Sequence, residues 1–334
     1  MKTVFYNNLT KGDKVIYDAI VLAAKEGKLT VSATNIKVSV VDMITDISLN
    51  YPEIFWLSHR TLVMKSLLST KLSLKYAYDS GTVRRYKEEI ERVSSEIINE
   101  CINEHQSDYD KVLALHDYLK RTIQYDYEAY RAKQSKSADD AHNLVGPLLK
   151  KKCVCEGFAK AMKYLCDKIG VECHCINGIG SSSLERGEHA WNVVKINGYY
   201  HHVDVTWDNQ FADDNQIPMY AYLNLSDEAI SKDHSWNRNY YPKCPDDPYN
   251  YFKMNRSLVS SKTQLERFLI DNLSLEESQI VFKVERGSSL EQEILGCIES
   301  AITRASSKCK YVNVKSCSYY YVMEQLVFSI NIAY

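Results

Sequence analysis

A cysteine, a histidine and an aspartate in the middle of the chain have types and spacing suited to chemistry. Cys155 precedes His189 by 34 residues, and Asp204 follows His189 by 15. A thiol becomes a strong nucleophile when a neighbouring imidazole takes its proton, and a carboxylate can orient that imidazole and stabilise its charge. These three residues therefore fit covalent thiol catalysis, provided that the fold brings them together.

Cys155 lies at the predicted start of a helix that ends before Gly170. The positive end of the helix macrodipole stabilises an anion at such a position, which favours a reactive thiol. Gly157 would let another backbone or a substrate come close. Cys153 competes for the same role, but residues two apart face different directions, so at most one of the two thiols fits the site. The helix is predicted from apolar residues at helical spacing, namely Phe158, Met162, Leu165 and Ile169.

A β-hairpin is predicted to bring the imidazole and the carboxylate together. Asn197-Gly198 lies between two β-rich runs and indicates a two-residue type I′ turn. In that register His189 lies opposite Thr206, and Asp204 lies two positions before Thr206 on the same face. The imidazole and the carboxylate are then diagonal neighbours about 7–8 Å apart on an exposed face. The opposite face is predicted to point into the core and carries Ala190, Val194, Ile196, Val203, Val205 and Trp207.

Three motifs around these residues closely resemble those of the transglutaminase-like superfamily, in particular its bacterial stand-alone members. They are Val154-Cys-Glu-Gly-Phe-Ala159, His189-Ala-Trp-Asn192 and His202-Val-Asp-Val-Thr-Trp-Asp208. The resemblance extends from about Asp110 to Trp236, including His234-Ser-Trp236. It implies an α+β fold with a papain-like core, in which the helix bearing the nucleophile packs on an antiparallel sheet. By position it makes Cys155 the nucleophile, His189 the general base and acid, and Asp204 the orienting group.

The same motifs give substrate-binding or supporting roles to Gly157, Trp191 and Trp207. The resemblance implies cysteine-dependent acyl transfer or hydrolysis on an amide of a protein or peptide, through a thioester intermediate. Family members crosslink proteins, deamidate glutamine, cleave peptide bonds or remove glycans from peptides, and some are inactive, so the reaction stays open. A second oxyanion-hole donor, beside the backbone N–H of the nucleophile, is expected from the segment that contains Gln124, Tyr125 and Tyr127.

Two other functions fit parts of the sequence. An inactive transglutaminase-like binding module would carry the same fold, although the presence of all three triad residue types favours an enzyme. A zinc-stabilised interaction protein is suggested by two C-x-C pairs, because thiolates bind zinc tightly, but structural zinc sites usually use C-x₂-C. The pairs are Cys153–Cys155 and Cys173–Cys175. We therefore expect neither a metal nor a cofactor.

The composition argues against several classes of partner. The 334 residues carry a net charge of −2 and are 45% hydrophobic and 25% charged, as in ordinary globular proteins. This balance gives no electrostatic reason to expect nucleic acid or a membrane surface. The N-terminal residues lack the apolar core of a signal peptide, so we expect a cytoplasmic protein with mostly reduced thiols, or a secreted one if a leader has been removed. The expected partner is a protein or peptide substrate, and the oligomeric state stays open.

Periodicity and turn signals divide the chain into three predicted units. Residues 1–81 are expected to form an α/β unit, in which Ile54–Met64 is a strand. Residues 82–245 are expected to form the catalytic core, with an exposed loop over residues 128–143. Residues 246–334 are expected to form an α+β unit with the order helix, strand, helix and two late strands.

Overall fold

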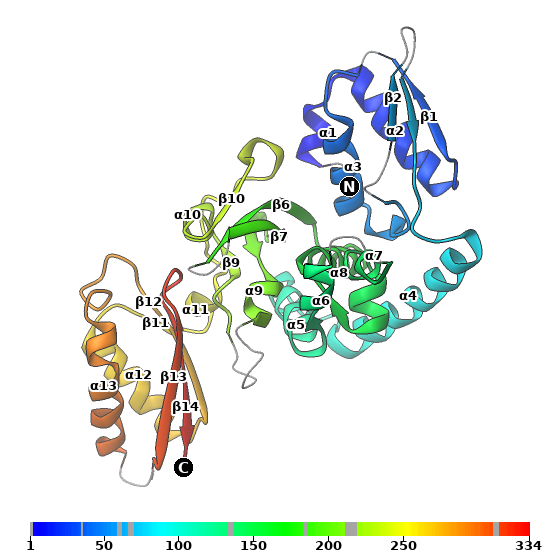
Figure 1. The fold of residues 1–334 in the computed structure, drawn as a ribbon. Coiled ribbons are helices and arrows are strands. Elements are labelled where there is room, and N and C mark those ends of the chain that lie inside the picture. Colours follow the sequence, from blue (N-terminus) through cyan, green and yellow to red (C-terminus); the bar gives the residue numbers. More distant parts are fainter. Residues whose placement is uncertain are drawn as a thin grey trace.

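The computed structural model describes residues 3–34, 36–58, 62–65, 70–132, 136–182, 186–210, 219–309 and 314–334. Three parts follow one another in space, from the blue N-terminal part at the upper right of Figure 1 to the red and orange C-terminal part at the lower left. Each part contains both helices and a sheet, so the predicted α+β class is confirmed. Among the described residues, none of the helices combines the length and the apolar character needed to cross a membrane.

The N-terminal part packs its helices on an antiparallel sheet with the strand order β1-β3-β2. The strand predicted over Ile54–Met64 is wrong in its first half. A 3-10 turn begins at Pro52 instead, and the buried Trp56 holds the following chain because its indole N–H donates to the carbonyl of Ala24 at 2.9 Å. Leu57 makes an isolated antiparallel bridge with Tyr76. Residues 59–61 lie outside the described part of the chain, and the pairing with β3 is described from β2 onward. The elements are α1 (Val4–Asn8), α2 (Lys11–Lys25), β1 (Thr30–Ala33), α3 (Val40–Asn50), η1 (Pro52–Ile54), β2 (Leu62–Lys65) and β3 (Thr70–Ser73).

The central part builds a five-stranded antiparallel sheet with the order β10-β6-β7-β8-β9. Helix α8 packs on this sheet, where Ala159 lies against Cys175 of β6 and Ala190 of β7. The predicted arrangement of a nucleophile-bearing helix on an antiparallel sheet is therefore confirmed. The elements up to this sheet are α4 (Ser80–Cys101), α5 (Asp108–Thr122), β4 (Gln124–Tyr125), α6 (Tyr127–Arg131), α7 (Lys136–Ala141), η2 (Val145–Lys150), β5 (Lys152–Cys153) and α8 (Cys155–Lys168).

The segment of residues 128–143 differs from the exposed loop that we predicted, because it includes α7 and most of α6. Asp126 starts α6 by accepting from the backbone N–H of Ala129 at 2.9 Å, so local capping overrides the polar composition. Residues 133–135 lie outside the described part. The remaining central elements are β6 (Cys173–Ser181), β7 (Arg186–Ile196), β8 (Tyr199–Val203), α9 (Val205–Gln210), β9 (Leu223–Leu225), α10 (Asp227–Ile230), β10 (His234–Trp236) and η3 (Arg238–Tyr240).

One hydrophobic core joins the N-terminal part to the central part. Polar contacts also cross between them. Asn50 of α3 accepts from the backbone N–H of Cys175 at 3.0 Å, and the buried Lys160 donates to Ser48 at 2.8 Å. The boundary predicted at residue 81 falls between regions that share a core, and the three predicted units stay a prediction.

The C-terminal part has its own hydrophobic core between two helices and a four-stranded sheet with the order β11-β12-β14-β13. From α12 onward its order of helix, strand, helix and two strands agrees with the sequence pattern, but the short α11 and β11 before it were not predicted. Val322 and Val327 also join a third cluster with Ile176 and Trp191, which connects this part to the central sheet. The elements are α11 (Tyr251–Met254), β11 (Leu258–Val259), α12 (Lys262–Ser274), β12 (Gln279–Val284), α13 (Ile294–Lys308), β13 (Ser316–Val322) and β14 (Val327–Ala333).

Candidate active site

Cys155 is the first residue of helix α8, and it is half-buried rather than enclosed. The N-cap residue is Val154, whose side chain makes no hydrogen bond to the first-turn N–H groups. The positive end of the helix therefore faces the thiol without a competing side-chain acceptor at the cap. Gly157 allows the first turn of α8 to pack closely against Ala141 and Cys153. A Cβ at position 157 would lie 2.5 Å from the carbonyl oxygen of Ala141 and 2.6 Å from the Cβ of Cys153.

Cys153, the competing thiol, is fully buried in β5 beside Tyr125 of β4. Burial raises the pKa of the Cys153 thiol well above its ordinary value, and the charges of Cys155 and Asp126 raise it further. A thiol held protonated inside the protein is a poor nucleophile. Of the two cysteines, Cys155 is thus the one placed to react.

The β7–β8 hairpin has the predicted two-residue turn. Asn197 and Gly198 have φ angles of 48° and 90°, and two successive positive φ values are what a type I′ turn requires. The pairing follows the predicted register from Ile196 opposite Tyr199 to the end of β8. The pairing ends at Val203, which lies opposite Asn192. The predicted pairing of His189 with Thr206 is therefore wrong, because Thr206 lies in helix α9.

The hairpin ends where Asp204 begins a helix. The backbone N–H of Trp207 donates to Oδ1 of Asp204 at 3.1 Å, which is the N-cap hydrogen bond of α9. The Asp204 backbone N–H donates to the carbonyl of Tyr222 at 3.0 Å, so it does not continue the ladder with β7. The cap fixes the carboxylate through one oxygen and leaves the other, Oδ2, for a second partner.

That second partner is the imidazole of His189. Its Nε2 lies 2.6 Å from Oδ2 of Asp204, so the two predicted residues are in direct hydrogen-bonding contact. The prediction of an exposed face is wrong, because His189 is 7% exposed and Asp204 is 1% exposed. The chain folds over the end of the hairpin here, and the Trp207 ring lies 5.6 Å from the imidazole. With Nε2 engaged, Nδ1 is the nitrogen left for the thiol of Cys155.

The electrostatics of the site favour the charged form of the imidazole. Burial by itself lowers the pKa of His189, but the charge of Asp204 and its hydrogen bond outweigh burial, and Cys155 adds to the effect, so the pKa rises to about 10. For Asp204, burial raises the pKa, whereas the charge and hydrogen bonds of His189 and His234 lower it below its ordinary value. The arrangement can therefore hold an imidazolium on the carboxylate of Asp204, with the thiol of Cys155 beside it.

Both predicted tryptophans lie against the imidazole. Trp191 stacks on His189 with ring centroids 5.9 Å apart and an interplanar angle of 19°. Trp191 is 1% exposed, so its position suits support of the ring better than contact with a substrate. Trp207 is half-buried and tilts over the same imidazole. Strand β6 leaves space for these rings, because a Cβ on Gly180 would lie 2.9 Å from Trp207 and 3.3 Å from His189.

A second histidine, which the sequence did not predict, lies on the same carboxylate. Nε2 of His234 lies 3.1 Å from Oδ2 of Asp204, the oxygen that also contacts His189. His234 belongs to the short strand β10, 30 residues beyond Asp204 in the sequence. The segment His234-Ser-Trp236 resembles one that recurs in the family. This resemblance does not by itself assign a function to His234.

Tyr125, one of the three candidate oxyanion donors, interacts electrostatically with the thiol of Cys155. Burial raises the pKa of the Tyr125 phenol, and the charge of Cys155 is the next cause of the rise. A phenol that stays protonated remains a hydrogen-bond donor. Tyr125 is buried in β4, directly beside the chain that leads into α8.

In the described part of the chain, two groups of three side chains bring possible metal-ligand atoms close together. In zinc sites, ligand atoms lie roughly 3.4 Å apart, given metal–ligand distances of about 2.1 Å at tetrahedral angles. The nitrogen–oxygen distances of 2.6 Å for His189–Asp204 and 2.9 Å for His202–Asp227 are instead those of hydrogen bonds. The two groups are His189, Asp204 and His234, and His202, Asp227 and Cys244.

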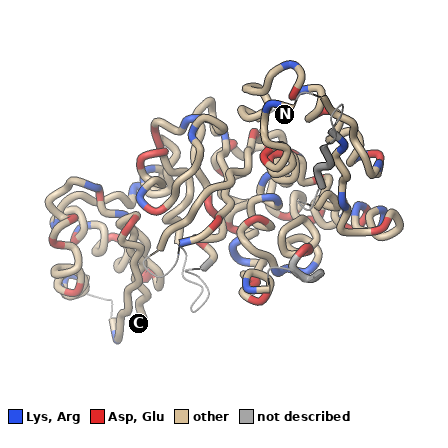
Figure 2. The backbone as a smooth tube through the Cα atoms, turned by 45° about the horizontal axis from the view of Figure 1, so that its top comes forward, with Lys and Arg blue, Asp and Glu red and all other residues tan. Residues whose placement is uncertain are grey.

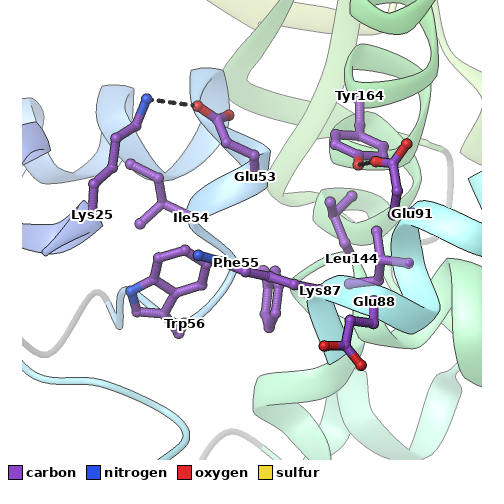
Figure 3. Close-up of a pocket in the computed structure, with 11 residues that line it drawn as sticks. Lys25, Glu53, Ile54, Phe55, Trp56, Lys87, Glu88, Glu91, Leu144 and Tyr164 are labelled. Carbon is purple, nitrogen blue, oxygen red and sulfur yellow. Dashed lines mark hydrogen bonds and ion pairs between the residues drawn. The ribbon is translucent and has the colours of Figure 1, made fainter. Parts of the chain in front are cut away.

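A groove of about 600 Å³ lies elsewhere, where the N-terminal part meets α4 and α8. Figure 3 shows the rings of Phe55 and Trp56 on one side and Tyr164 on the other, with the ion pair between Lys25 and Glu53 at 3.2 Å above them. Tyr164 is on α8, about 13 Å along the helix from its first residue. The groove does not include the three candidate site residues.

Comparison with known proteins gives a family match within the central part of the chain. Residues 95–205 match the transglutaminase-like superfamily. Kyphoscoliosis peptidase of Mus musculus is 29% identical over 127 residues, which are 36% of this chain and 19% of that protein. The Homo sapiens protein is 28% identical over 126 residues, 35% of this chain and 18% of its own length. The chain thus spans less than a fifth of these relatives.

The chain is also similar to a solved structure described as a TGase, with a TM-score of 0.30 and 16% sequence identity. The match covers 53% of this chain and 50% of the chain in that structure.

Proposed function

Through residues 95–205 the chain belongs to the transglutaminase-like superfamily, and from this premise we propose that it is a cysteine-dependent acyltransferase or hydrolase. Its triad is Cys155, His189 and Asp204. Its substrate is an amide of a protein or peptide, either the side chain of a glutamine or a peptide bond. The observation that carries the proposal is the buried 2.6 Å contact between His189 and Asp204 beside a half-buried thiol at a helix start.

The proposed reaction has two steps. The Cys155 thiolate attacks the amide carbonyl, the C–N bond breaks, and the His189 imidazolium gives its proton to the departing nitrogen, which leaves as ammonia or an amine. The product of this step is a thioester. In the second step neutral His189 takes a proton from an amine or a water molecule, which attacks the thioester and releases the thiol. Asp204 orients the imidazole and stabilises its charge in both steps.

We propose that the negative oxygen of the tetrahedral intermediates is bound by two donors. One is the backbone N–H of Cys155, which lies at the uncapped start of α8. The other is the Tyr125 phenol, which interacts electrostatically with the thiol and whose pKa is raised by burial. A phenol in this state would donate to an oxyanion without losing its own proton.

The proposed partner is a protein or peptide rather than a nucleic acid or a membrane. Lys and Arg are interspersed with Asp and Glu over the described chain in Figure 2, and the formal net charge is −2. Binding to a phosphate backbone depends on clustered positive charge. A peptide-bond substrate is one branch of the proposal, because the relatives from mouse and human are named as peptidases.

The test of the nucleophile is alkylation with iodoacetamide at neutral pH, followed by mass spectrometry of each cysteine. We expect Cys155 to be labelled far faster than the other nine thiols, and the His189→Ala variant to lose that selectivity. The exposed Cys317 is the internal control for access without activation. Slow labelling of Cys155, at the rate of Cys317, would contradict the proposal and favour an inactive binding module.

The reaction itself is tested with a glutamine-containing protein substrate such as casein, with and without a fluorescent primary amine. Incorporation of the amine identifies a transglutaminase, release of ammonia alone identifies a deamidase, and shorter fragments identify a peptidase. The Cys155→Ser variant is the matched control, since it differs by one atom at the nucleophile.

A further inference from the structure

Asp204 accepts hydrogen bonds from more groups than a triad needs. Its Oδ1 caps α9, and its Oδ2 faces Nε2 of His189 at 2.6 Å and Nε2 of His234 at 3.1 Å. An ionised carboxylate oxygen only accepts, so each imidazole fills its contact by donating an N–H. The orientation of Asp204 toward His189 is therefore set jointly by a helix cap and by a second histidine.

The register of the sheet explains how two histidines meet on one carboxylate. Strand β6 lies between β10 and β7, with Gly180 opposite His234 on one side and Gly178 opposite His189 on the other. The ring centroids of His189 and His234 are 5.3 Å apart. A Cβ on Gly180 would lie 3.3 Å from His189 and 2.9 Å from the Trp207 ring, and a Cβ on Gly178 would lie 2.6 Å from the Trp191 ring, so both glycines make room for the side chains that surround the two histidines.

The far side of the His234 ring is held by a second carboxylate. Nδ1 of His234 lies 2.5 Å from Oδ1 of Asp233. The other oxygen of Asp233 accepts from the Tyr222 hydroxyl at 2.7 Å and from the side-chain amide of Gln325 at 3.2 Å. Gln325 is 2% exposed and lies in the turn between β13 and β14, so the C-terminal part of the chain contributes a donor to this network.

From these contacts we infer that His234 is a positioning residue for the triad, which holds Asp204 in the rotamer that orients His189. We further infer that Asp233, braced from the C-terminal part by Gln325, holds His234 in turn. The inference rests on the proposed function, since it assigns a role to residues that act through Asp204. It makes the C-terminal part a structural support of the active site rather than an independent appendage.

The ring of His234 also packs between aromatic side chains, which a purely structural histidine would do as well. Its centroid lies 4.4 Å from that of Trp207 and 4.9 Å from that of Trp191. A test must therefore separate the donated hydrogen bond from the packing. A glutamine at position 234 places its amide N–H₂ near the position of Nε2, so it can keep the hydrogen bond to Asp204. An asparagine places its amide N–H₂ near the position of Nδ1, so it can keep the hydrogen bond to Asp233 instead.

The experiment measures the iodoacetamide rate constant of Cys155 in the full chain for the wild type and for His234→Gln, His234→Asn and His234→Ala. We expect His234→Gln to stay near the wild-type rate, because it keeps a donor to Asp204. We expect His234→Asn and His234→Ala to react about tenfold more slowly, the usual effect of losing one charge-assisted hydrogen bond. Thermal unfolding of each variant is measured in parallel.

Two results would overturn the inference. One is an unchanged rate in all three His234 variants, and the other is an equal loss in His234→Gln and His234→Ala, which would assign the effect to packing. If His234→Asn fails to fold, Gln325→Ala replaces it, with an expected fall of roughly threefold, and an unchanged rate contradicts the role of Asp233. Slow iodoacetamide labelling of Cys155 in the wild type would contradict the proposed function instead. The two failures are therefore distinguishable.

Discussion

The central part of the chain contains two clusters with the same three residue types and opposite chemistry. One is Cys155, His189 and Asp204, and the other is Cys244, His202 and Asp227, in which Nε2 of His202 lies 2.9 Å from Asp227. In the second cluster the indole N–H of Trp191 donates to Nδ1 of His202 at 3.0 Å. Both nitrogens of that imidazole are therefore occupied, and neither can take a proton from the thiol.

The charges of the two clusters differ accordingly. Burial lowers the pKa of His202, and Asp227 offsets this only in part, whereas His189 has its pKa raised to about 10. Cys244 is fully buried, and burial raises the pKa of its thiol, while Cys155 is half-buried at a helix start. Residue types and proximity alone therefore do not make a triad. A thiol nucleophile also needs an imidazole nitrogen that can take its proton and access to the substrate.

The largest expected effect separates the two thiols. Cys155→Ser should lower the rate of acyl transfer or hydrolysis by about a thousandfold or more, because the hydroxyl is a far weaker nucleophile than a thiolate. Cys244→Ser should leave the rate per folded molecule unchanged. Both are measured with the casein assay. An active Cys155→Ser variant would break the comparison, since the two clusters would then be equivalent.

The next effect separates the two imidazoles. His189→Ala should slow the chemical step by about 10²–10⁴-fold through loss of the general base. His202→Ala should keep selective labelling of Cys155 but lose about 2 kcal/mol or more of stability, because the buried Trp191 N–H and Asp227 lose their partner. Labelling rates and chemical denaturation together give both values. Loss of selectivity in a folded His202→Ala variant would contradict the assignment.

A pH series tests the carboxylate of the proposed triad. Because the pKa of His189 is raised from 6.5 to about 10, its ion pair with Asp204 stabilises the fold fully below about pH 6.5 and loses that effect as the pH rises through about 10. Asp204→Asn removes the charge and keeps an oxygen for the α9 cap. The free energy of unfolding should fall from pH 6.5 to 10 in the wild type and stay flatter in Asp204→Asn.

The same carboxylate is expected to set the alkaline limb of the proposed reaction. In the proposed mechanism the imidazolium of His189 donates the proton in the first step, so the rate should fall as the pH rises through about 10. In Asp204→Asn the charge that raises the pKa of His189 is gone, so burial lowers this pKa. The alkaline limb should then move to lower pH. An alkaline limb at the same pH in both proteins would show that Asp204 does not act on His189.

The smallest expected effect concerns the helix start that exposes Cys155. Gly157→Ala should destabilise the protein by about 1–3 kcal/mol, because the new Cβ would lie 2.5 Å from the Ala141 carbonyl. Gly296→Ala on α13 is the matched control, since it meets nothing within 4 Å and should stabilise by about 0.5–1 kcal/mol. Thermal unfolding measures both. Equal shifts would show that the Gly157 turn is not tightly packed.

Local signals in the sequence determined much of the active-site scaffold. The apolar spacing after Cys155 gave the helix with this residue at its start, and Asn197-Gly198 gave the hairpin turn and its register. These features depend on periodicity and backbone conformation over a few residues, which is why one sequence suffices. Where polar composition competed with local capping, as in residues 128–143, the sequence led to a wrong expectation.

Tertiary structure alone decided which groups are buried and which contact which. The sequence predicted His189 and Asp204 as neighbours on an exposed face, whereas the Asp204 cap ends the hairpin and both side chains are buried. His234 reaches Asp204 from strand β10, and Gln325 reaches Asp233 from the turn between β13 and β14. No periodic pattern predicts such contacts. Burial and long-range hydrogen bonds depend on how sheets and helices cover one another, and they also separate the Cys155 cluster from the Cys244 cluster.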